Sequence, residues 1–303
     1  MSAGNQSRPQ HQTNWDWRAA GNFIGGGTGT GLLLFAAISS VAGLSPAVPV
    51  CAALVLIALG LFCVWLEIGR PWRSMNVMLH VRTSWMTRES LLAPLLFGSG
   101  LIALATGSAV ALWLGALLAM LFLYCQARLL NAAKGIPAWR QKLVVPLIVA
   151  TGLTEGVGLL ALLTALAGSP HIAWLPAALL VLLLMRALLW RAYRKNLAAH
   201  GAPQQALAVL DRLESPFIRI GHWAPVLLLM PVLLLVLLQP TLAAAQWLTA
   251  LAGLIAVAGG WLFKYTLIVR AGYNQGYALP HVPVRGGAGP GSGLASKPGW
   301  NRF

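Results

Sequence analysis

The residues best suited to chemistry lie in one stretch, Leu66–Ser90, with the sequence LEIGRPWRSMNVMLHVRTSWMTRES. It contains two of the six acidic residues of the chain, Glu67 and Glu89, together with His80. It also contains four arginines and two tryptophans: Arg70, Trp72, Arg73, Arg82, Trp85 and Arg88. Because the stretch separates two long apolar runs, this density of ionisable and aromatic groups indicates chemistry or the docking of a partner.

Glu89 and His80 are the candidate proton-transferring residues of this stretch. Histidine titrates near neutral pH, and a positioned carboxylate can accept a proton from a reacting group. A quinol site needs hydrogen-bonding groups for two ring oxygens, an apolar slot and a proton acceptor near water, all of which this stretch can supply. The simpler interpretations are an interfacial ion pair between Glu67 and Arg70, and a helix N-terminus that favours an acid at Glu89.

Glu155 is a further candidate, because it lies near the middle of the apolar run LIVATGLTEGVGLL. A charged acid at the centre of a membrane costs about 2.5–3.5 kcal/mol on insertion scales, so it usually faces other helices and has a partner. Glu155 is either a proton relay or quinone ligand, or a protonated side chain that bonds a neighbouring helix. The same choice between a site and a helix–helix hydrogen bond applies to Asn22.

The composition places these residues in a membrane protein. The 303 residues are 58% hydrophobic and only 9% charged, whereas soluble domains carry about 25% charged residues. We therefore expect an all-α polytopic membrane protein. A formal charge of +15 would indicate nucleic-acid binding in a soluble protein, but membrane topology accounts for it here, so we expect no nucleic-acid partner.

Eight apolar runs are long enough to span a bilayer, which takes about 20 residues. The third is the shortest and can begin as early as Thr87, and the last is long enough to tilt or to extend beyond the membrane. The first 18 residues are polar and contain no cleavable signal, so we expect direct insertion. The eight runs are Ala19–Ala42, Val48–Ile68, Leu91–Thr106, Ala109–Ala132, Leu143–Ala167, Ile172–Trp190, Trp223–Gln239 and Leu242–Val269.

The basic residues predict the orientation. All 21 lysines and arginines fall in the two terminal segments, in the segments after the second, fourth and sixth runs, or in the last two turns of the fourth, sixth and eighth runs, and the other loops have none. Basic residues near span ends stay in the cytoplasm. We therefore expect both termini and the basic loops on the cytoplasmic side of a bacterial inner membrane. We expect residues 1–285 to form one eight-helix domain, Gln204–Leu213 a short surface helix, and residues 286–303 a flexible tail.

The remaining patterns concern metals and helix packing. All six histidines lie in tails, loops or span ends, and the three cysteines lack metal-ligand spacing. We therefore expect no transmembrane haem and no metal site in this chain. In the first apolar run, two glycine series repeat every four residues: Gly21, Gly25 and Gly29, and Gly27 and Gly31. Small residues at this spacing let helices approach closely in lipid.

Three motifs resemble a known family. They are LEIGRPWR…RTSWMTRE, the GIPAW turn at Gly135–Trp139, and the glycine-rich first span. Together they resemble the membrane-anchor subunits of molybdopterin oxidoreductase complexes, which include the polysulfide reductase, NrfD-like nitrite reductase and dimethyl sulfoxide reductase anchors. The opening NWDWRAAGNFIGGG is most similar to the branch of phenylacetyl-CoA:acceptor oxidoreductase membrane subunits. The resemblance covers essentially all eight spans.

The resemblance implies two four-helix bundles, no haem, and a site for menaquinone or ubiquinone near a docked partner. The implied partners are a ferredoxin-like iron–sulfur subunit and a molybdopterin catalytic subunit, which hold the Fe–S clusters and the molybdenum or tungsten. Family members carry an acid at the position of Glu89 that is implicated in quinol chemistry. Some have histidine where this chain has Glu67, so the role of Glu67 is not carried over.

We therefore expect a haem-free subunit that anchors such a complex and exchanges electrons with quinone. The alternatives are a proton-coupled secondary transporter that uses Glu155, and a passive anchor without a quinone site. The candidate residues fall into three sets: Glu89, His80 and Glu155 for proton transfer; Asn22, Glu67, Arg82, Trp85 and Asn131 for the quinone; and Arg70, Arg73, Arg88 and Arg140 for partner docking.

Overall fold

The computed structural model describes residues 8–67, 77, 80–169, 172–238 and 243–276. Its described part is helical apart from turns and one bridge between the two ends of the chain. Eight candidate spans are long and apolar enough to cross a membrane, which confirms the expected all-α class and number of spans. The long helices are α1 Trp17–Val41, α2 Ala47–Glu67, α3 Trp85–Thr106, α4 Ala109–Ala132, α6 Val144–Leu166, α7 Trp174–Ala199, α9 Ala224–Leu238 and α10 Ala243–Tyr265.

Shorter elements extend or connect these helices. α5 (Pro137–Arg140) caps one end of the array, and the π-helical turn η3 (Thr266–Arg270) extends α10. α8 (Gln204–Glu214) runs through the π-helix η2 (Ser215–Trp223) into α9, so these three elements form one continuous candidate span.

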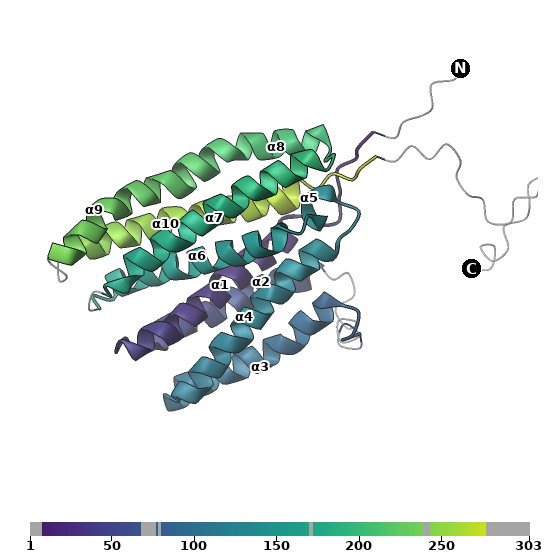
Figure 1. Cartoon of the computed structure of the whole chain (residues 1–303). Helices are drawn as coiled ribbons and strands as arrows, with labels where there is room; N and C mark the ends of the chain where they lie inside the picture. Colours follow the sequence, from purple (N-terminus) through teal and green to yellow (C-terminus); the bar gives the residue numbers. More distant parts are fainter. Residues whose placement is uncertain (1–7, 68–76, 78–79, 170–171, 239–242, 277–303) are drawn as a thin grey trace, which may run out of the picture.

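The long helices form two groups of four (Figure 1). The first consists of α1 to α4, and the second of α6, α7, α9 and α10. α1 is the central helix of the molecule, because it packs on α2 and α4 in its own group and on α6 and α10 in the other. A polar side chain on α1 can therefore take part in a site in either group, depending on the face that carries it.

The two glycine series of α1 create its closest helix contacts. A Cβ on Gly25 would lie 2.5 Å from Leu56 O of α2, closer than Cβ atoms approach other atoms. A Cβ on Gly31 would collide with Gly152 O of α6, and a Cβ on Gly156 would lie 2.5 Å from Gly31 Cα. The first series thus packs on α2 and Gly31 packs on α6, which confirms the predicted close approach.

Both ends of the described chain leave the array at the same end, beside α5 (Figure 1). Residues 10–12 pair with residues 272–274 through Gln12 N, which donates to Gly272 O at 2.8 Å, and Asn274 N, which donates to Gln10 O at 3.0 Å. The starts of α3 and α6 and the ends of α4 and α7 lie at this end because successive spans alternate in direction. We call it the basic end, because the exposed residues Arg82, Lys134, Lys142, Arg191 and Arg212 lie there.

Two boundaries differ from the sequence prediction. The long loop expected from Arg191 to Gly221 is helical, because α7 continues to Ala199 and α8 follows after a short turn. The predicted helix at Gln204–Leu213 exists, but it is the first part of the seventh span rather than a separate surface helix. Its Leu210 and Leu213 are buried in the same apolar cluster as Trp190, which explains why the chain stays helical here.

The start of α3 also differs slightly from the prediction. The helix begins at Trp85, two residues before the earliest expected position, because the Ser84 side chain accepts a hydrogen bond from Thr87 N at 3.2 Å and caps it. At the opposite end, Gly107 adopts a left-handed conformation with φ of +69° and closes a two-residue turn into α4. The predicted flexible tail, residues 286–303, lies outside the described residues.

Candidate functional site

Glu89 lies in the second turn of α3, close to the basic end, and is 4% exposed. It belongs to a three-helix polar cluster with Asn22 of α1 and Gln126 of α4, which are 3% and 0% exposed. We call these three residues the Glu89 cluster. Asn22 Nδ2 donates to Glu89 Oε1 at 3.2 Å, and Gln126 Nε2 donates to the same oxygen at 3.4 Å. Glu89, which we predicted to transfer protons, and Asn22, which we predicted to bind the quinone, are thus hydrogen-bonded to each other.

The packing of α1 makes room for this cluster. A Cβ on Gly26 would lie 2.8 Å from Gln126 Cδ and even closer to its amide nitrogen. Gln126 can therefore occupy its position only because residue 26 is a glycine. Gln126 Nε2 also donates to the backbone oxygen of Asn22 at 3.1 Å, which fixes the orientation of the amide group. Gln126 is one of two amides in the fourth apolar run, with Asn131, and no motif in the sequence distinguishes it.

Each member of the Glu89 cluster leaves one oxygen without a partner: Asn22 Oδ1, Glu89 Oε2 and Gln126 Oε1. An unpaired buried polar atom typically costs about 1–3 kcal/mol, so its presence in a structure requires an explanation. All three atoms are hydrogen-bond acceptors. The cluster therefore matches a bound group that carries O–H or N–H donors.

Trp85 holds two arginines beside this cluster. The Arg88 guanidinium lies 4.1 Å from the centre of the indole ring, and that of Arg128 lies 4.8 Å away. Arg88 also donates to Val81 O and Arg82 O, both at 2.9 Å. Arg88, predicted as a docking residue, thus fastens the start of α3 to the preceding loop. The Arg82 side chain is exposed to solvent at the basic end.

Two other predicted residues of the Leu66–Ser90 stretch, His80 and Glu67, make no hydrogen bond to the Glu89 cluster. His80 is exposed, and its backbone oxygen accepts hydrogen bonds from Thr83 N and Ser84 N. Glu67 is half-buried at the end of α2, and its predicted ion pair with Arg70 lies outside the described residues. The predicted docking residue Arg73 also lies outside them.

Asp16 and Arg18 hold the start of α1 beside the end of α2. Arg18 Nη1 donates to Leu66 O at 2.9 Å, and Arg18 forms a 2.8 Å ion pair with Asp16. The hydrogen bond from the Arg18 side chain holds the pKa of Asp16 below its ordinary value of 3.8. Asp16 also caps α1 by accepting from Arg18 N at 2.8 Å.

Asn131 and Arg140 are connected to the GIPAW turn rather than to Glu89. Asn131 Nδ2 donates to Trp139 O at 3.3 Å and to Gln141 O at 3.2 Å. Trp139 Nε1 donates to Leu267 O at 2.9 Å, which ties the turn to η3. Arg140 Nη1 donates to Lys134 O at 3.3 Å. These bonds give Asn131 a visible structural role at the junction of the two helix groups.

An apolar groove opens toward the lipid between α2 and α3. It is lined by Ala58, Leu61, Phe62 and Trp65 of α2 and Phe97 of α3, and it is shallow and largely open, with a volume of about 540 Å³. Phe62 and Trp65 stack at 5.9 Å with 18° between their planes. At the same depth, Gly60 of α2 packs on α1, where its Cβ would lie 3.1 Å from Asn22 O. The groove is therefore next to the helices that carry Asn22 and Glu89.

Glu155 belongs to a second polar cluster on the opposite face of α1. Its Oε2 forms a 2.6 Å ion pair with Lys264 Nζ, and both side chains are 0% exposed. Thr28 Oγ1 donates to the same oxygen at 2.7 Å. Our sequence interpretation grouped Lys264 with the basic residues of the C-terminal end. The structure instead buries this side chain fully, between Gly27 of α1 and Glu155 of α6.

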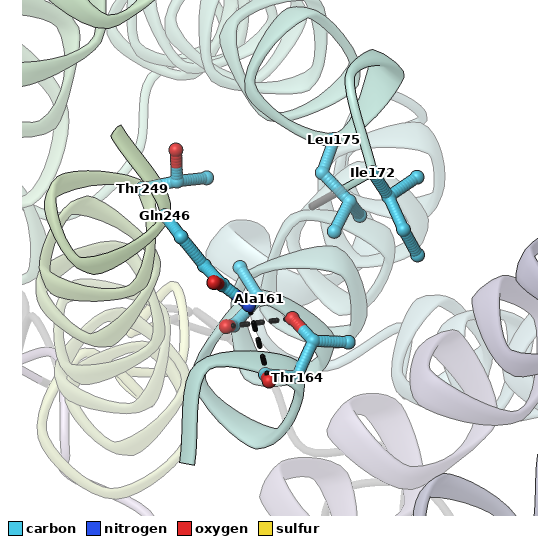
Figure 2. A pocket seen from close by; sticks show the side chains of 6 residues that line it. All are labelled: Ala161, Thr164, Ile172, Leu175, Gln246 and Thr249. Carbon is cyan, nitrogen blue, oxygen red and sulfur yellow. Dashed lines mark hydrogen bonds between the residues drawn. The ribbon is translucent and has the colours of Figure 1, made fainter. Parts of the chain in front are cut away.

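A third polar position lies at the end of the array opposite to the basic end, where α6 ends and α10 begins; Figure 2 shows the side chains that line it. There Gln246 of α10 donates from Nε2 to Thr164 O at 3.2 Å and to Ser169 O at 3.0 Å. The small pocket around it has a volume of about 10 Å³, roughly the space of one water molecule. It is lined by Ala161, Thr164, Ile172, Leu175, Gln246 and Thr249. This space is too small for an aromatic ring.

Comparison with known proteins does not identify a function for these sites. No model of a known protein family matches the chain, and no curated protein matches it. Within the described ranges, no group of three or more histidine, cysteine, aspartate or glutamate side chains could hold a metal ion.

Proposed function

We propose that this chain is a haem-free, quinone-reactive membrane subunit of an oxidoreductase complex. In this proposal the quinol ring binds at the Glu89 cluster, and the basic end docks an iron–sulfur subunit that connects to a molybdopterin subunit. Electrons pass from quinol to the iron–sulfur clusters, or from the clusters to quinone. We place the basic end on the cytoplasmic side of a bacterial inner membrane, on the basis of its charge.

The observation that carries this proposal is the set of unpaired acceptors around a buried acid. A quinol has two O–H donors, which can bond two of the three free oxygens of Asn22, Glu89 and Gln126. Oxidation of a quinol to a quinone releases two electrons and two protons. The Glu89 carboxylate can accept one of these protons as a general base. Asn22 and Gln126 donate to its other oxygen and so hold the carboxylate in position.

The groove between α2 and α3 supports the same proposal. A membrane quinone carries a long apolar tail and reaches its site from the lipid. Four residues of α2 and one of α3, the helix that carries Glu89, provide an apolar surface of suitable chemistry. Ligand sites are typically apolar spaces with a few placed polar groups, and the groove and cluster together have this composition.

The basic end supports the docking of a partner. Exposed basic residues from four different spans and loops meet there: Arg82, Lys134, Lys142, Arg191 and Arg212. A surface of one charge sign attracts a partner of the opposite sign and speeds association. Because Glu89 lies in the second turn from this end, electrons would have a short path to a docked cluster.

Purification of the complex from its native membrane tests the proposal. We expect the full chain to co-purify with a subunit whose iron–sulfur clusters give electron paramagnetic resonance signals. Addition of a short-tailed quinol should reduce these clusters, and a quinol-site inhibitor should prevent the reduction. Absence of an iron–sulfur partner would contradict the assignment. If quinol did not reduce the clusters, the chain would be a passive anchor without a quinone site.

A proton-coupled secondary transporter is the second candidate function, and the buried Glu155–Lys264 pair favours it. Intramembrane ion pairs often mark proton pathways. Solute uptake into proteoliposomes that contain this chain alone, and loss of that uptake in Glu155→Gln, would support the transporter and contradict the anchor proposal.

A further inference from the structure

The Glu155–Lys264 pair is built into the packing of the second helix group. A Cβ on Gly27 of α1 would collide with Lys264 Nζ, and a Cβ on Gly260 of α10 would lie 3.0 Å from Glu155 Cδ. Both glycines therefore leave the space that the pair fills. Thr28, which bonds Glu155 Oε2, itself accepts a hydrogen bond from Trp261 Nε1 at 2.9 Å. Glu155 Oε1 has no partner.

A second buried cation, Arg186 of α7, lies in the same group and is 0% exposed. Its three nitrogens donate to His222 Nε2 at 3.0 Å, Ala256 O at 3.1 Å and Gly221 O at 2.7 Å. Gly221 O is available because Pro225, four residues later, has no N–H to donate to it. Arg186 thus joins α7 to α10 and to the π-helix η2. Such π-helical turns often occur at functional sites.

The hydrogen bonds of His222 define its charge. Because arginine can only donate, His222 Nε2 must accept, and the ring proton is then on Nδ1, which bonds Phe217 O at 2.8 Å. His222 is therefore neutral. It contributes no charge to balance Arg186.

The charges around the pair do not sum to zero. Arg186 bonds Ala256 O of α10, one turn before Gly260, which lies against Glu155, so the three charged groups share one region of the interior. With one acid, two bases and a neutral His222, the cluster carries a net charge of +1. Among the described residues, the only other buried Asp, Glu, Lys or Arg side chain is Glu89, which contacts a different part of α1. No second acid from α1, α7, η2 or α10 compensates for the excess.

Loss of one proton would neutralise the cluster, whereas gain of one would raise its charge to +2. Charges interact strongly in a low-dielectric interior, so the neutral arrangement is favoured over the doubly positive one. Arginine keeps its proton in proteins, and Glu155 is already a carboxylate in the ion pair. The only group that can release a proton is therefore Lys264.

We propose that Lys264 is a proton-exchanging group in the second helix group, with Glu155 and Arg186 as the residues that position it and set its charge. The Lys264 ammonium releases one proton, which passes to water at the basic end, and becomes an amine that accepts a hydrogen bond. Glu155 keeps its negative charge and balances Arg186. This proton site is separate from the Glu89 cluster and does not depend on the proposed quinone chemistry.

Nuclear magnetic resonance of the full chain in lipid nanodiscs tests this proposal directly. The chain has five lysines, Lys134, Lys142, Lys195, Lys264 and Lys297, and ¹³C labelling of their Cε atoms distinguishes the ammonium from the amine. The signal of Lys264 is identified by its absence in Lys264→Met. We expect the Lys264 signal to shift to the amine position at a pH where the four other lysines are still ammonium.

Two variants test the roles of the neighbours in opposite directions. Arg186→Gln keeps an amide donor but removes the excess charge, so Lys264 should remain ammonium as long as the surface lysines do. Glu155→Gln removes the anion that holds the ammonium, so Lys264 should become an amine at a lower pH than in the wild type. Arg191→Gln, an exposed site on the same helix, is the control and should change nothing.

The proposal is overturned if wild-type Lys264 remains ammonium together with the other lysines, which would identify a purely structural ion pair. It is also overturned if Arg186→Gln and Glu155→Gln shift the Lys264 signal in the same direction. Because the first measurement uses the wild-type chain, it stands even if one variant fails to fold. No quinone is added, so the result is independent of the proposed electron transfer.

Discussion

The junction of the two helix groups makes the most quantitative prediction. At this junction Gly156 of α6 faces Gly31 of α1, and a Cβ on Gly156 would lie 2.5 Å from Gly31 Cα. The obstacle is backbone, which cannot rotate away as a side chain can. Gly156→Ala must therefore push α1 and α6 apart.

The size of the effect follows from this geometry. Carbon atoms pack best at about 3.5 Å or more, and Gly31 C is closer still than Gly31 Cα, so the helices would have to separate by more than about 1 Å. Inserting a methyl group into a tight core costs about 1–3 kcal/mol. The same separation stretches the 2.7 Å bond from Thr28 to Glu155, which crosses the same junction and contributes about 1 kcal/mol. We expect Gly156→Ala to lower the free energy of unfolding by about 2–4 kcal/mol.

The assay is reversible denaturant unfolding of the full chain in mixed micelles. Gly98→Ala is the matched control, because a Cβ at Gly98 in α3 meets no atom within 4 Å. Alanine is the better helix former, so the control should be unchanged or slightly more stable. If Gly156→Ala were as stable as Gly98→Ala, the two helix groups could not meet along Gly31 and Gly156.

Three further predictions concern other contacts. Trp139→Phe should cost about 1–3 kcal/mol of unfolding free energy, because it leaves a buried carbonyl without its donor. Removing Glu155 or Lys264 alone should each destabilise by about 3–5 kcal/mol, whereas Glu155→Gln with Lys264→Met should cost less than the sum, as a double-mutant cycle would measure. Because Arg18 lowers the folded-state pKa of Asp16, the wild type should lose a small stabilisation as the pH falls below 3.8, and this loss should be absent in Asp16→Asn.

Hydropathy was sufficient to predict the architecture. A run of about 20 apolar residues in lipid has to be helical, because only a helix satisfies its own backbone hydrogen bonds. The glycine spacing of α1 also predicted close helix contacts, since it depends only on helical periodicity. The prediction failed between the sixth and seventh spans, where charged residues suggested a loop. There α7 and α8 stay helical because their apolar positions pack around Trp190.

The pairings within the two polar clusters could not be predicted from the sequence. Glu155 was visible as an acid within an apolar run and Glu89 as an acid just before one, but their partners lie 37 to 127 residues away in the chain. Gln126 had no motif around it. Lys264 has the sequence context of an interfacial anchor, and only the packing of α10 against α1 and α6 places it beside Glu155. The sequence was enough to identify these residues by their type, but only the folded structure shows which of them are in contact.

The central claim is that Glu89 takes the proton of a bound quinol. Glu89→Gln is the least disruptive test, because the amide keeps an oxygen that can accept the hydrogen bonds from Asn22 and Gln126. The measurement is the rate at which quinol reduces the iron–sulfur clusters of the purified complex, with Glu214→Gln, an exposed acid at the end of α8, as the control. We predict that Glu89→Gln lowers this rate by about 10²–10⁴-fold, the usual loss when a general base is removed, and that Glu214→Gln leaves it unchanged. A Glu89→Gln complex that kept the wild-type rate would contradict the account.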